Sequence, residues 1–220
     1  MSNLKENVFF SKRWPALVVL SIISGLVYSQ ALNFDFVWDD RKNIIENSFL
    51  NPPSLQSILF FWKNQFLGMY VPVPYTFWGS IEILRSFFSS EEMNAFVFHL
   101  SNIAIHTLNG FLVYLLLTKI IKNNFAILSA TIFFIVHPLQ TETVSWISET
   151  RGLLATFFGL SSVIFYLQSV SLNDETKYKR FLSFKYIGGF LCFIFALLSK
   201  PSSAVIPLFA IVLESYIYKT

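Results

Sequence analysis

Charged residues and cysteine are both scarce in this chain of 220 residues. Only 13% of the residues are charged, against about 25% in ordinary soluble domains, whereas 54% are hydrophobic and 18% are aromatic. The one cysteine, Cys192, lies within an apolar run, which excludes a disulfide framework and a cysteine-based metal site. The composition therefore excludes an ordinary soluble domain and indicates a membrane protein.

Several motifs of soluble enzymes and of nucleic-acid-binding proteins are also missing. The chain has no glycine-rich phosphate loop, no nucleotide-binding fingerprint and no Ser-His-Asp order. Its net charge of +3 is spread over short loops rather than gathered in one basic patch, so nucleic acid is not an expected partner. No Asn-x-Ser/Thr acceptor site occurs, which leaves both a bacterial inner membrane and the endoplasmic reticulum open as locations.

Six apolar stretches predict an all-α, polytopic transmembrane helical bundle. A helix needs about 20 residues to cross the hydrocarbon core, and the first stretch has about this length. No small-residue cleavage site follows it, so we expect a retained helix rather than a signal peptide. The third and fifth stretches are shorter than about 17 residues, so these helices must extend into their flanks, lie in a thinned bilayer or be sheltered by neighbouring helices. The predicted spans lie near residues 14–33, 96–118, 125–137, 152–170, 186–199 and 202–218.

The topology depends on residues 70–88. This segment carries Glu82 and Arg85, and a charge at the centre of a span costs at least about 2.5 kcal/mol. If the segment lies in the membrane interface, most loop lysines and arginines fall on one side, as the positive-inside rule requires. We therefore predict that residues 34–95 form one outer loop that contains an interfacial helix at 70–88. The basic residues expected inside are Lys5, Lys12, Arg13, Lys119, Lys122, Lys177, Lys179, Arg180, Lys185 and Lys219, and those expected outside are Arg41, Lys42, Lys63, Arg85, Arg151 and Lys200.

A second interfacial helix is predicted in the same loop, at residues 54–66. Apolar residues recur there at helical spacing after an Asn-Pro-Pro turn, which is typical of an amphipathic helix in the headgroup plane. The apolar face is formed by Leu55, Ile58, Leu59, Trp62 and Phe66.

Two adjacent acids, Asp39 and Asp40, follow the first span and lie next to Trp38. Adjacent carboxylates near a region of low dielectric repel each other, so one of them can serve as a general base, or the two can share a divalent cation. A solvated acidic turn explains the same pattern. The sequence leaves these alternatives open.

The segment 137–151 concentrates polar residues directly after a short span. It contains His137, Glu142, Glu149 and Arg151, and a proline follows the histidine. Non-helical backbone at membrane depth requires protein or a water-filled cavity beside it, so the segment is expected to line a cleft. The alternative is a structured turn with an ion pair between Glu149 and Arg151.

Lys200 ends the fifth span and precedes a proline. A lysine in this place suits an anionic headgroup or a phosphate. Snorkelling of a long side chain to the interface explains the same position.

The second span carries a polar stripe. His99, Asn102, His106 and Asn109 are spaced by three, four and three residues, so they lie on one face of the helix. Such a stripe must face other helices or a cavity. We expect hydrogen bonds between helices, with contact to a metal or substrate as the alternative.

Five segments, taken together, resemble a known family. They are FVWDDRKNIIEN (36–47), Tyr-Val-Pro (70–72), FHLSNIAIHTLNGFLVYLL (98–116), HPLQTETVSWISETRGLLA (137–155) and LLSKPSSAVIP (197–207). Their residues, order and spacing resemble the polytopic GT-C glycosyltransferases, and among these the transmembrane and tetratricopeptide-repeat O-mannosyltransferases and their bacterial relatives. The resemblance implies that residues 1–220 are the N-terminal part of a GT-C membrane domain.

The resemblance further implies an enzyme whose active face is periplasmic or lumenal. It would move a sugar such as mannose from a polyprenyl-phosphate carrier to an acceptor hydroxyl on a protein or glycan, and whether a divalent cation takes part stays open. A carboxylate would accept the proton of the hydroxyl, with Asp39 as the first choice, while cations stabilise the departing phosphate. The expected catalytic residues are Asp39, Asp40 and Glu142, and those expected at the donor phosphate are His137, Arg151 and Lys200.

Some features depart from the family pattern or fit two roles equally well. Val71 replaces a frequent arginine, and Thr-Arg-Gly at 150–152 differs from the usual Arg-x-Asp or Arg-x-Asn. Trp62 or Trp146 can stack on a sugar or belong to an aromatic belt. Two other functions are compatible with the sequence: a transporter or lipid flippase whose pathway is lined by the polar stripe, and a truncated, non-catalytic membrane scaffold.

Overall fold

A computed structural model of the chain describes residues 14–88, 93–170 and 183–218. Every regular element in these residues is a helix, which confirms the predicted all-α membrane bundle. In chain order the elements, with η marking 3-10 and π helices, are α2 (Trp14–Tyr28), η1 (Ser29–Asn33), η2 (Arg41–Ile45), α3 (Leu55–Lys63), α4 (Pro72–Ser86), α5 (Ala95–Leu117), α6 (Asn124–Val136), α7 (Gln140–Ser145), η3 (Ile147–Glu149), α8 (Thr150–Val170), α10 (Phe184–Ser199), η4 (Pro201–Val205) and α11 (Ile206–Tyr218).

Four of the six predicted spans are long and apolar enough to cross a membrane. The two stretches predicted to be short form short helices, since α6 has 13 residues and α10 has 16. At 1.5 Å per residue, α6 is about 20 Å long, which is less than the hydrocarbon thickness of about 30 Å. Both pack against longer helices, α6 on α2 and α5, and α10 on α8. The four long stretches are Trp14–Asn33, Ala95–Leu117, Ile147–Val170 and Pro201–Tyr218.

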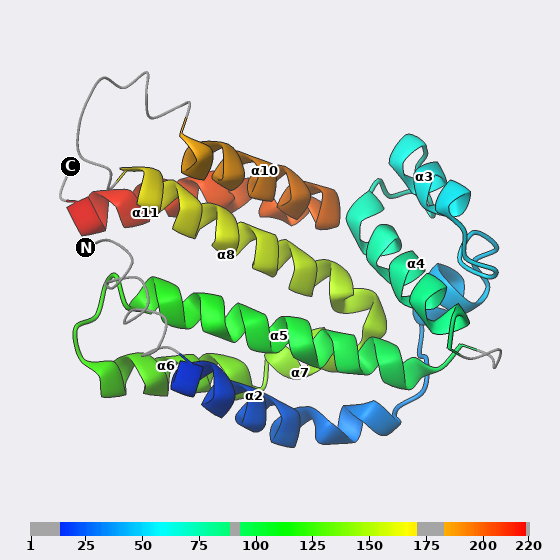
Figure 1. Cartoon of the computed structure of the whole chain (residues 1–220), viewed down its shortest axis with the longest axis horizontal. Helices are drawn as coiled ribbons and strands as arrows, with labels where there is room; N and C mark the ends of the chain where they lie inside the picture. The colour runs from blue at the N-terminus through cyan, green and yellow to red at the C-terminus, as the bar shows by residue number, and fades with distance from the viewer. Residues whose placement is uncertain (1–13, 89–92, 171–182, 219–220) are drawn as a thin grey trace.

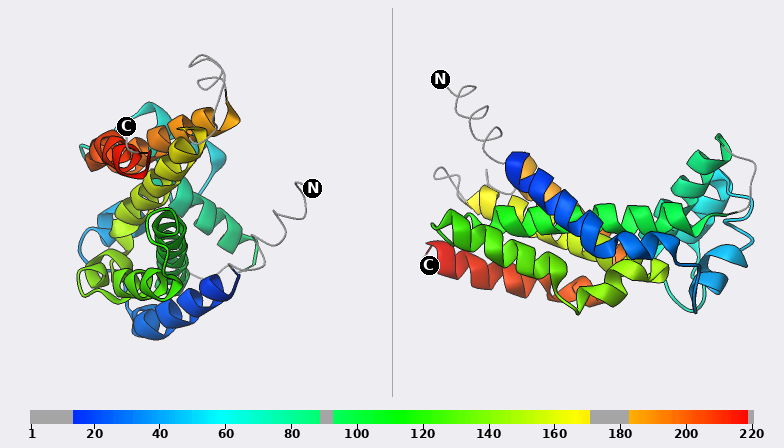
Figure 2. Two further views of the ribbon diagram at one scale, coloured as in Figure 1. Left: turned by 90° about the vertical axis from the view of Figure 1, so that its left-hand side faces the viewer. Right: turned by 90° about the horizontal axis from the view of Figure 1, so that it is seen from below.

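The long helices lie side by side, and the small helices gather at one end. Figure 1 shows α5 and α8 in the middle, with α2 and α6 along α5 and with α10 and α11 along α8. The helices α3 and α4 lie beyond one end of this bundle, which we call the α4 end (Figure 1). The right-hand view of Figure 2 shows the same elongated arrangement from below, and the left-hand view looks along the bundle. The connections that follow α2, α6 and α10 all turn at the α4 end (Figure 1).

The described basic residues divide between the two ends as predicted. The connection 118–123, with Lys119 and Lys122, and the start of α10, with Lys185, lie opposite the α4 end (Figure 1). The residues predicted on the outer side all belong to segments at the α4 end. The other residues predicted on the inner side lie outside the described residues: Lys5, Lys12, Arg13, Lys177, Lys179, Arg180 and Lys219.

The helix α4 lies across the end of the bundle rather than alongside the long helices. It packs against α3, α5, α8 and α10. Its buried Glu82 accepts a hydrogen bond from Nε of Arg85 at 3.0 Å. Burial raises the pKa of Glu82, and the hydrogen bond and charge of Arg85 oppose this shift. The two charges that argued against a span are thus held within a protein contact.

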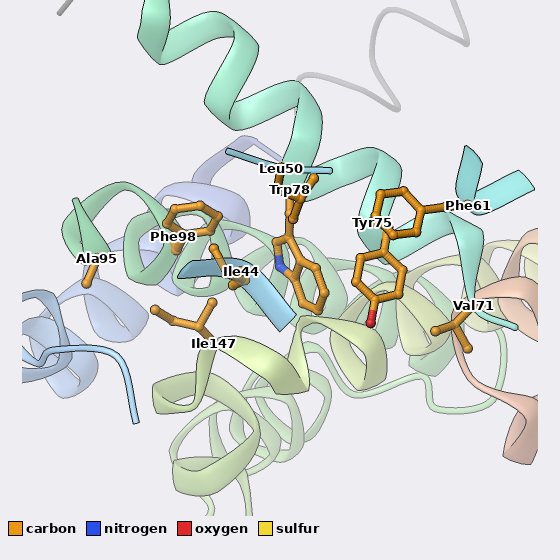
Figure 3. Packing of buried hydrophobic residues seen from close by; sticks show 9 residues of the cluster. All are labelled: Ile44, Leu50, Phe61, Val71, Tyr75, Trp78, Ala95, Phe98 and Ile147. Carbon is orange, nitrogen blue, oxygen red and sulfur yellow. The ribbon is translucent and has the colours of Figure 1, made fainter. Parts of the chain in front are cut away.

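Aromatic rings form the core at the α4 end. Phe61 of α3 stacks on Tyr75 of α4 with ring centroids 4.3 Å apart, and Tyr75 meets Trp78 edge-on at 5.2 Å. Figure 3 shows these rings packed among residues of the first loop, α5 and η3. The buried members of this core are Ile44, Leu50, Phe61, Val71, Tyr75, Trp78, Ala95, Phe98 and Ile147.

The predicted apolar face of residues 54–66 is partly wrong. The helix α3 ends before Phe66, which lies in the following turn. Phe61, which the pattern left out, is 1% exposed, whereas Leu55 and Leu59 are 74% and 55% exposed. The reason is that α3 packs on α4 rather than on a flat lipid surface, so the side facing α4 is buried.

The polar stripe of α5 joins neighbouring segments. The Nδ2 of Asn102 donates to two carbonyl oxygens of the α7–η3 segment at 3.3 and 3.2 Å, and Nδ2 of Asn109 donates to one of α8 at 3.0 Å. The Nε2 of His106 lies 3.0 Å from a carbonyl oxygen of α6. Hydrogen bonding between helices is therefore confirmed for these three residues, while the ring nitrogens of His99 have no partner among the described residues.

We expect Gly110→Ala to destabilise the contact between α5 and α6. A Cβ at Gly110 would lie 2.6 Å from Cδ1 of Ile135, which is fully buried. Overpacking of this kind costs about 1–3 kcal/mol, so the Tm in detergent should fall, and Ile135→Val should restore part of the loss. Gly25→Ala is the control, because nothing lies within 4 Å of a Cβ there. An equal fall in the control would contradict the packing.

Candidate active site

Asp40 is a fully buried carboxylate that joins the first and second loops of the α4 end. Its Oδ1 accepts hydrogen bonds from the N–H and the hydroxyl of Ser148, at 2.8 and 2.6 Å. Its Oδ2 accepts the N–H of Val37 at 3.0 Å. A buried charge is tolerated where such donors surround it. These bonds fix together two segments that are 108 residues apart in sequence.

The hydrogen bonds continue from Ser148 into α4. Its Oγ accepts from Nδ2 of Asn43 at 3.1 Å, and Oδ1 of Asn43 accepts from the hydroxyl of Tyr75 at 2.8 Å. Burial raises the pKa of Tyr75 to about 12, with Arg151 lowering it and Asp39 raising it further. The phenol therefore stays protonated at neutral pH and keeps its role as donor.

A tight turn presents Trp38 and Asp39 to solvent. The N–H of Asp40 donates to the carbonyl oxygen of Val37 at 2.9 Å, which closes the turn. Trp38 has a φ of 47°, a left-handed conformation that costs an ordinary residue roughly 1–2 kcal/mol. Its side chain is 74% exposed, and Asp39 is exposed beside it. The turn thus sends one aspartate inward and the other outward.

Arg151 contacts both the Ser148 segment and the turn that leads into α4. Its Nε donates to the carbonyl oxygen of Ser148 at 2.9 Å, and its Nη1 lies 3.6 Å from the sulfur of Met69. The methionine belongs to a tight turn in which Gly68 has a φ of 76°. A fixed guanidinium is therefore held between the second loop and the segment that leads into α4.

Lys200 pairs with Glu149. The Nζ–Oε2 distance is 2.9 Å, so the alternative in which Glu149 pairs with Arg151 is wrong. The reason is the connection between α10 and α11, because the η4 turn that follows Lys200 packs beside α8, which begins directly after Glu149. Gly152 leaves room for the pair, since a Cβ there would lie 2.7 Å from Oε2 of Glu149.

A cavity of about 430 Å³ opens beside this ion pair, between α7, α8, η4 and α11. One part of its lining is polar and the rest is apolar, which is the pattern that an amphiphile requires. The polar lining consists of Gln140, Thr143, Glu149, Thr156, Lys200, Ser202 and Ser203, and the larger apolar residues are Leu160, Val163, Ile206 and Phe209.

Comparison with curated proteins shows what this membrane chain is related to. The protein O-mannosyl-transferase F38B6.6 of Caenorhabditis elegans is 31% identical over 170 residues, which are 71% of this chain and 24% of that protein. The protein O-mannosyl-transferase TMTC3 of Homo sapiens is 27% identical over 157 residues, which are 68% of this chain and 17% of that protein. This chain is a relative of the protein O-mannosyl-transferases.

The relationship extends to insects and confirms the resemblance seen in the motifs. The protein O-mannosyl-transferase Tmtc1 of Drosophila melanogaster is 26% identical over 170 residues, or 74% of this chain and 19% of that protein. The chain thus spans less than a quarter of the length of these O-mannosyl-transferases. No family model and no solved structure matches it.

Two residues that the resemblance to O-mannosyl-transferases singles out lie in the segment between α6 and η3. His137 follows α6, and its Nδ1 accepts the N–H of Leu139 at 3.2 Å. Glu142 is exposed on α7. Within the described residues, no hydrogen bond or ion pair joins either side chain to Asp39 or Lys200. Their assigned roles stay predictions.

A divalent cation shared by Asp39 and Asp40 stays a prediction. Both oxygens of Asp40 already accept hydrogen bonds from protein donors. In the described part of the chain, no three His, Cys, Asp or Glu residues come together as candidate metal ligands. Asp39 is the exposed carboxylate of the pair.

The uncharged residues that hold the site were not predicted from the sequence. Ser148 and Asn43 connect the two loops, and Tyr75 extends the connection to α4. Ser148 lies within the motif segment 137–155 and Asn43 within 36–47. Membership of these motifs is the sequence signal that could have indicated a role for both residues.

We expect the two aspartates to respond differently to the same substitution. Asp40→Asn replaces one carboxylate oxygen, which accepts hydrogen bonds from Val37 or Ser148, by an NH₂ group that cannot accept them. The substitution should lower the free energy of unfolding by about 1–3 kcal/mol. Asp39→Asn changes an exposed side chain and should alter it by less than about 0.5 kcal/mol. Unfolding in detergent, followed by circular dichroism, measures both. Equal losses in the two variants would contradict the anchoring role of Asp40.

Proposed function

We propose that the chain is the N-terminal part of a membrane glycosyltransferase that moves a mannose-like sugar from a polyprenyl-phosphate carrier to a hydroxyl of an acceptor protein. The names of the relatives support transfer of mannose to protein. One observation carries the proposal. The bonds between Asp40 and Ser148 fix the turn that exposes Asp39, and this turn lies at the same end of the bundle as Lys200, which lines the cavity.

The cavity beside α8 suits the lipid-borne donor. A polyprenyl-phosphate sugar has one negative charge next to a long apolar chain. The ammonium of Lys200 would meet the phosphate, exchanging part of its interaction with Glu149, because phosphate oxygens accept strong charge-assisted hydrogen bonds. The apolar chain would follow the wall formed by Leu160, Ile206 and Phe209 toward the membrane.

Asp39 would act as the general base. The acceptor oxygen attacks the anomeric carbon of the sugar while the carboxylate takes the hydroxyl proton. The bond between that carbon and the phosphate oxygen breaks, and the phosphate leaves with the bonding electrons and inversion at the carbon. Lys200 and Arg151 would stabilise the negative charge of the leaving phosphate.

We place this reaction on the periplasmic or lumenal face of a multi-pass protein. The connection 118–123, which contains Lys119 and Lys122, lies at the end opposite α4 (Figure 1). The positive-inside rule assigns such a connection to the cytoplasmic side. The α4 end then faces outward, whether the membrane is that of a bacterium or of the endoplasmic reticulum.

In the transporter alternative, polar residues such as His106 and Asn109 would line a pathway. Both residues bond backbone oxygens of neighbouring helices, which favours a structural role for them. If the chain is a non-catalytic scaffold, it transfers no mannose.

The full chain in lipid nanodiscs should release or transfer mannose from radiolabelled polyprenyl-phosphate mannose in the presence of a serine- and threonine-rich peptide. Asp39→Asn should lower the turnover by about 10²–10⁴-fold, because a general base contributes this much. Lys200→Met should raise the KM for the donor. Lys122→Met, at the opposite end, is the matched control and should behave as the unmodified chain. Turnover that is unchanged in Asp39→Asn would refute the assignment, and no turnover in any variant would favour the scaffold.

A further inference from the structure

Trp38 is a large, mostly apolar residue that is exposed rather than buried in the core. The residue is 74% exposed, although it lies two positions before the fully buried Asp40. Its backbone is left-handed, with a φ of 47°, which a bulky residue rarely adopts. Strained residues of this kind persist where surrounding structure fixes them, and they cluster at functional sites.

Hydrogen bonds of Asp40 fix the turn in which Trp38 is exposed. Both oxygens of Asp40 are held by donors of Val37 and Ser148, and its N–H closes the turn on Val37. The two residues between these anchor points, Trp38 and Asp39, therefore project outward together. The carboxylate of Asp39 and the indole of Trp38 thus belong to two adjacent exposed residues.

Trp146 supports the indole from the second loop. The two rings meet edge to face, with centroids 5.3 Å apart and an interplanar angle of 89°. In this geometry one ring presents its edge to the other, so the contact covers at most one face of Trp38. Because Trp38 is 74% exposed, most of its surface stays open to solvent.

We propose that Trp38 is a stacking platform for the pyranose ring of the sugar that is transferred or extended. A pyranose has an apolar face of C–H groups that packs on an indole, and hydroxyls at its rim that donate to a carboxylate. Trp38 supplies the first contact and Asp39 the second, while Trp146 is a positioning residue that fixes the platform. The proposal rests on the proposed function and names the group that orients its sugar.

A binding measurement that needs no turnover tests the platform. The probe is methyl α-mannopyranoside, observed by saturation-transfer NMR with the full chain in lipid nanodiscs, since sugar-based detergents would compete. Trp38→Leu keeps apolar volume but removes the aromatic face, and it should raise the Kd by about tenfold or more, the effect of losing one stacking contact. Trp38→Phe keeps a smaller face and should bind with an intermediate Kd.

The control separates stacking from anchoring in the membrane interface. Trp14, at the start of α2, is also exposed, at 61%, and lies at the other end of the bundle. Trp14→Leu should leave the saturation transfer unchanged, and an unchanged Tm in all variants shows that they fold. Equal binding by Trp38→Leu and the unmodified chain overturns the proposal, as does the absence of saturation transfer in the unmodified chain.

Kinetics with the lipid-linked donor identify the source of the sugar. A higher KM for polyprenyl-phosphate mannose in Trp38→Leu indicates the donor's ring, and a higher KM for a mannosylated peptide alone indicates the acceptor's ring. Either result supports the platform, and unchanged KM values overturn it. Mannoside binding that depends on Trp38 without any transfer would leave the platform in place and refute the proposed function.

Discussion

One buried carboxylate holds the α4 end of the molecule together. Asp40 accepts hydrogen bonds from Val37 and from both donors of Ser148, so a charge removed from water is compensated by groups on two distant loops. Removing one side of such an arrangement leaves a buried charge without its partners, which is more costly than losing an ordinary hydrogen bond. The bonds that continue through Asn43 to Tyr75 attach α4 to the same point. The turn that carries Trp38 and Asp39, and the Ser148 segment that Arg151 contacts, are joined by this interaction.

The anchor explains why two adjacent aspartates can have different roles. With Asp40 held inward, the turn has to send Asp39 and Trp38 outward, and the left-handed backbone of Trp38 follows from that constraint. The second loop contributes Glu149, which pairs with Lys200 of the α10–η4 connection in the lining of an amphiphilic cavity. An exposed base, an aromatic surface and a cation near an apolar cavity are the groups that transfer from a lipid-linked sugar requires.

The helices could be predicted because the signals for them are local. Apolar runs indicated the long helices and the short α6 and α10, and the spacing of Asn102, His106 and Asn109 indicated the polar stripe that joins helices. The buried side of α3 could not be predicted, because it is set by Tyr75 on α4 and not by the pattern within α3. The anchoring by Asp40 and the pairing of Lys200 are contacts across 108 and 51 residues, and periodicity carries no information about such contacts.

The central claim is that the loops following α2 and α6 meet in one aqueous compartment. Cysteine accessibility tests it most directly, with Asp39→Cys, Glu142→Cys or Lys122→Cys introduced singly into a chain in which Cys192 is replaced by serine. A membrane-impermeant maleimide applied to sealed, oriented vesicles should label positions 39 and 142 from the same side and position 122 from the other. Labelling of positions 39 and 142 from opposite sides would contradict the account.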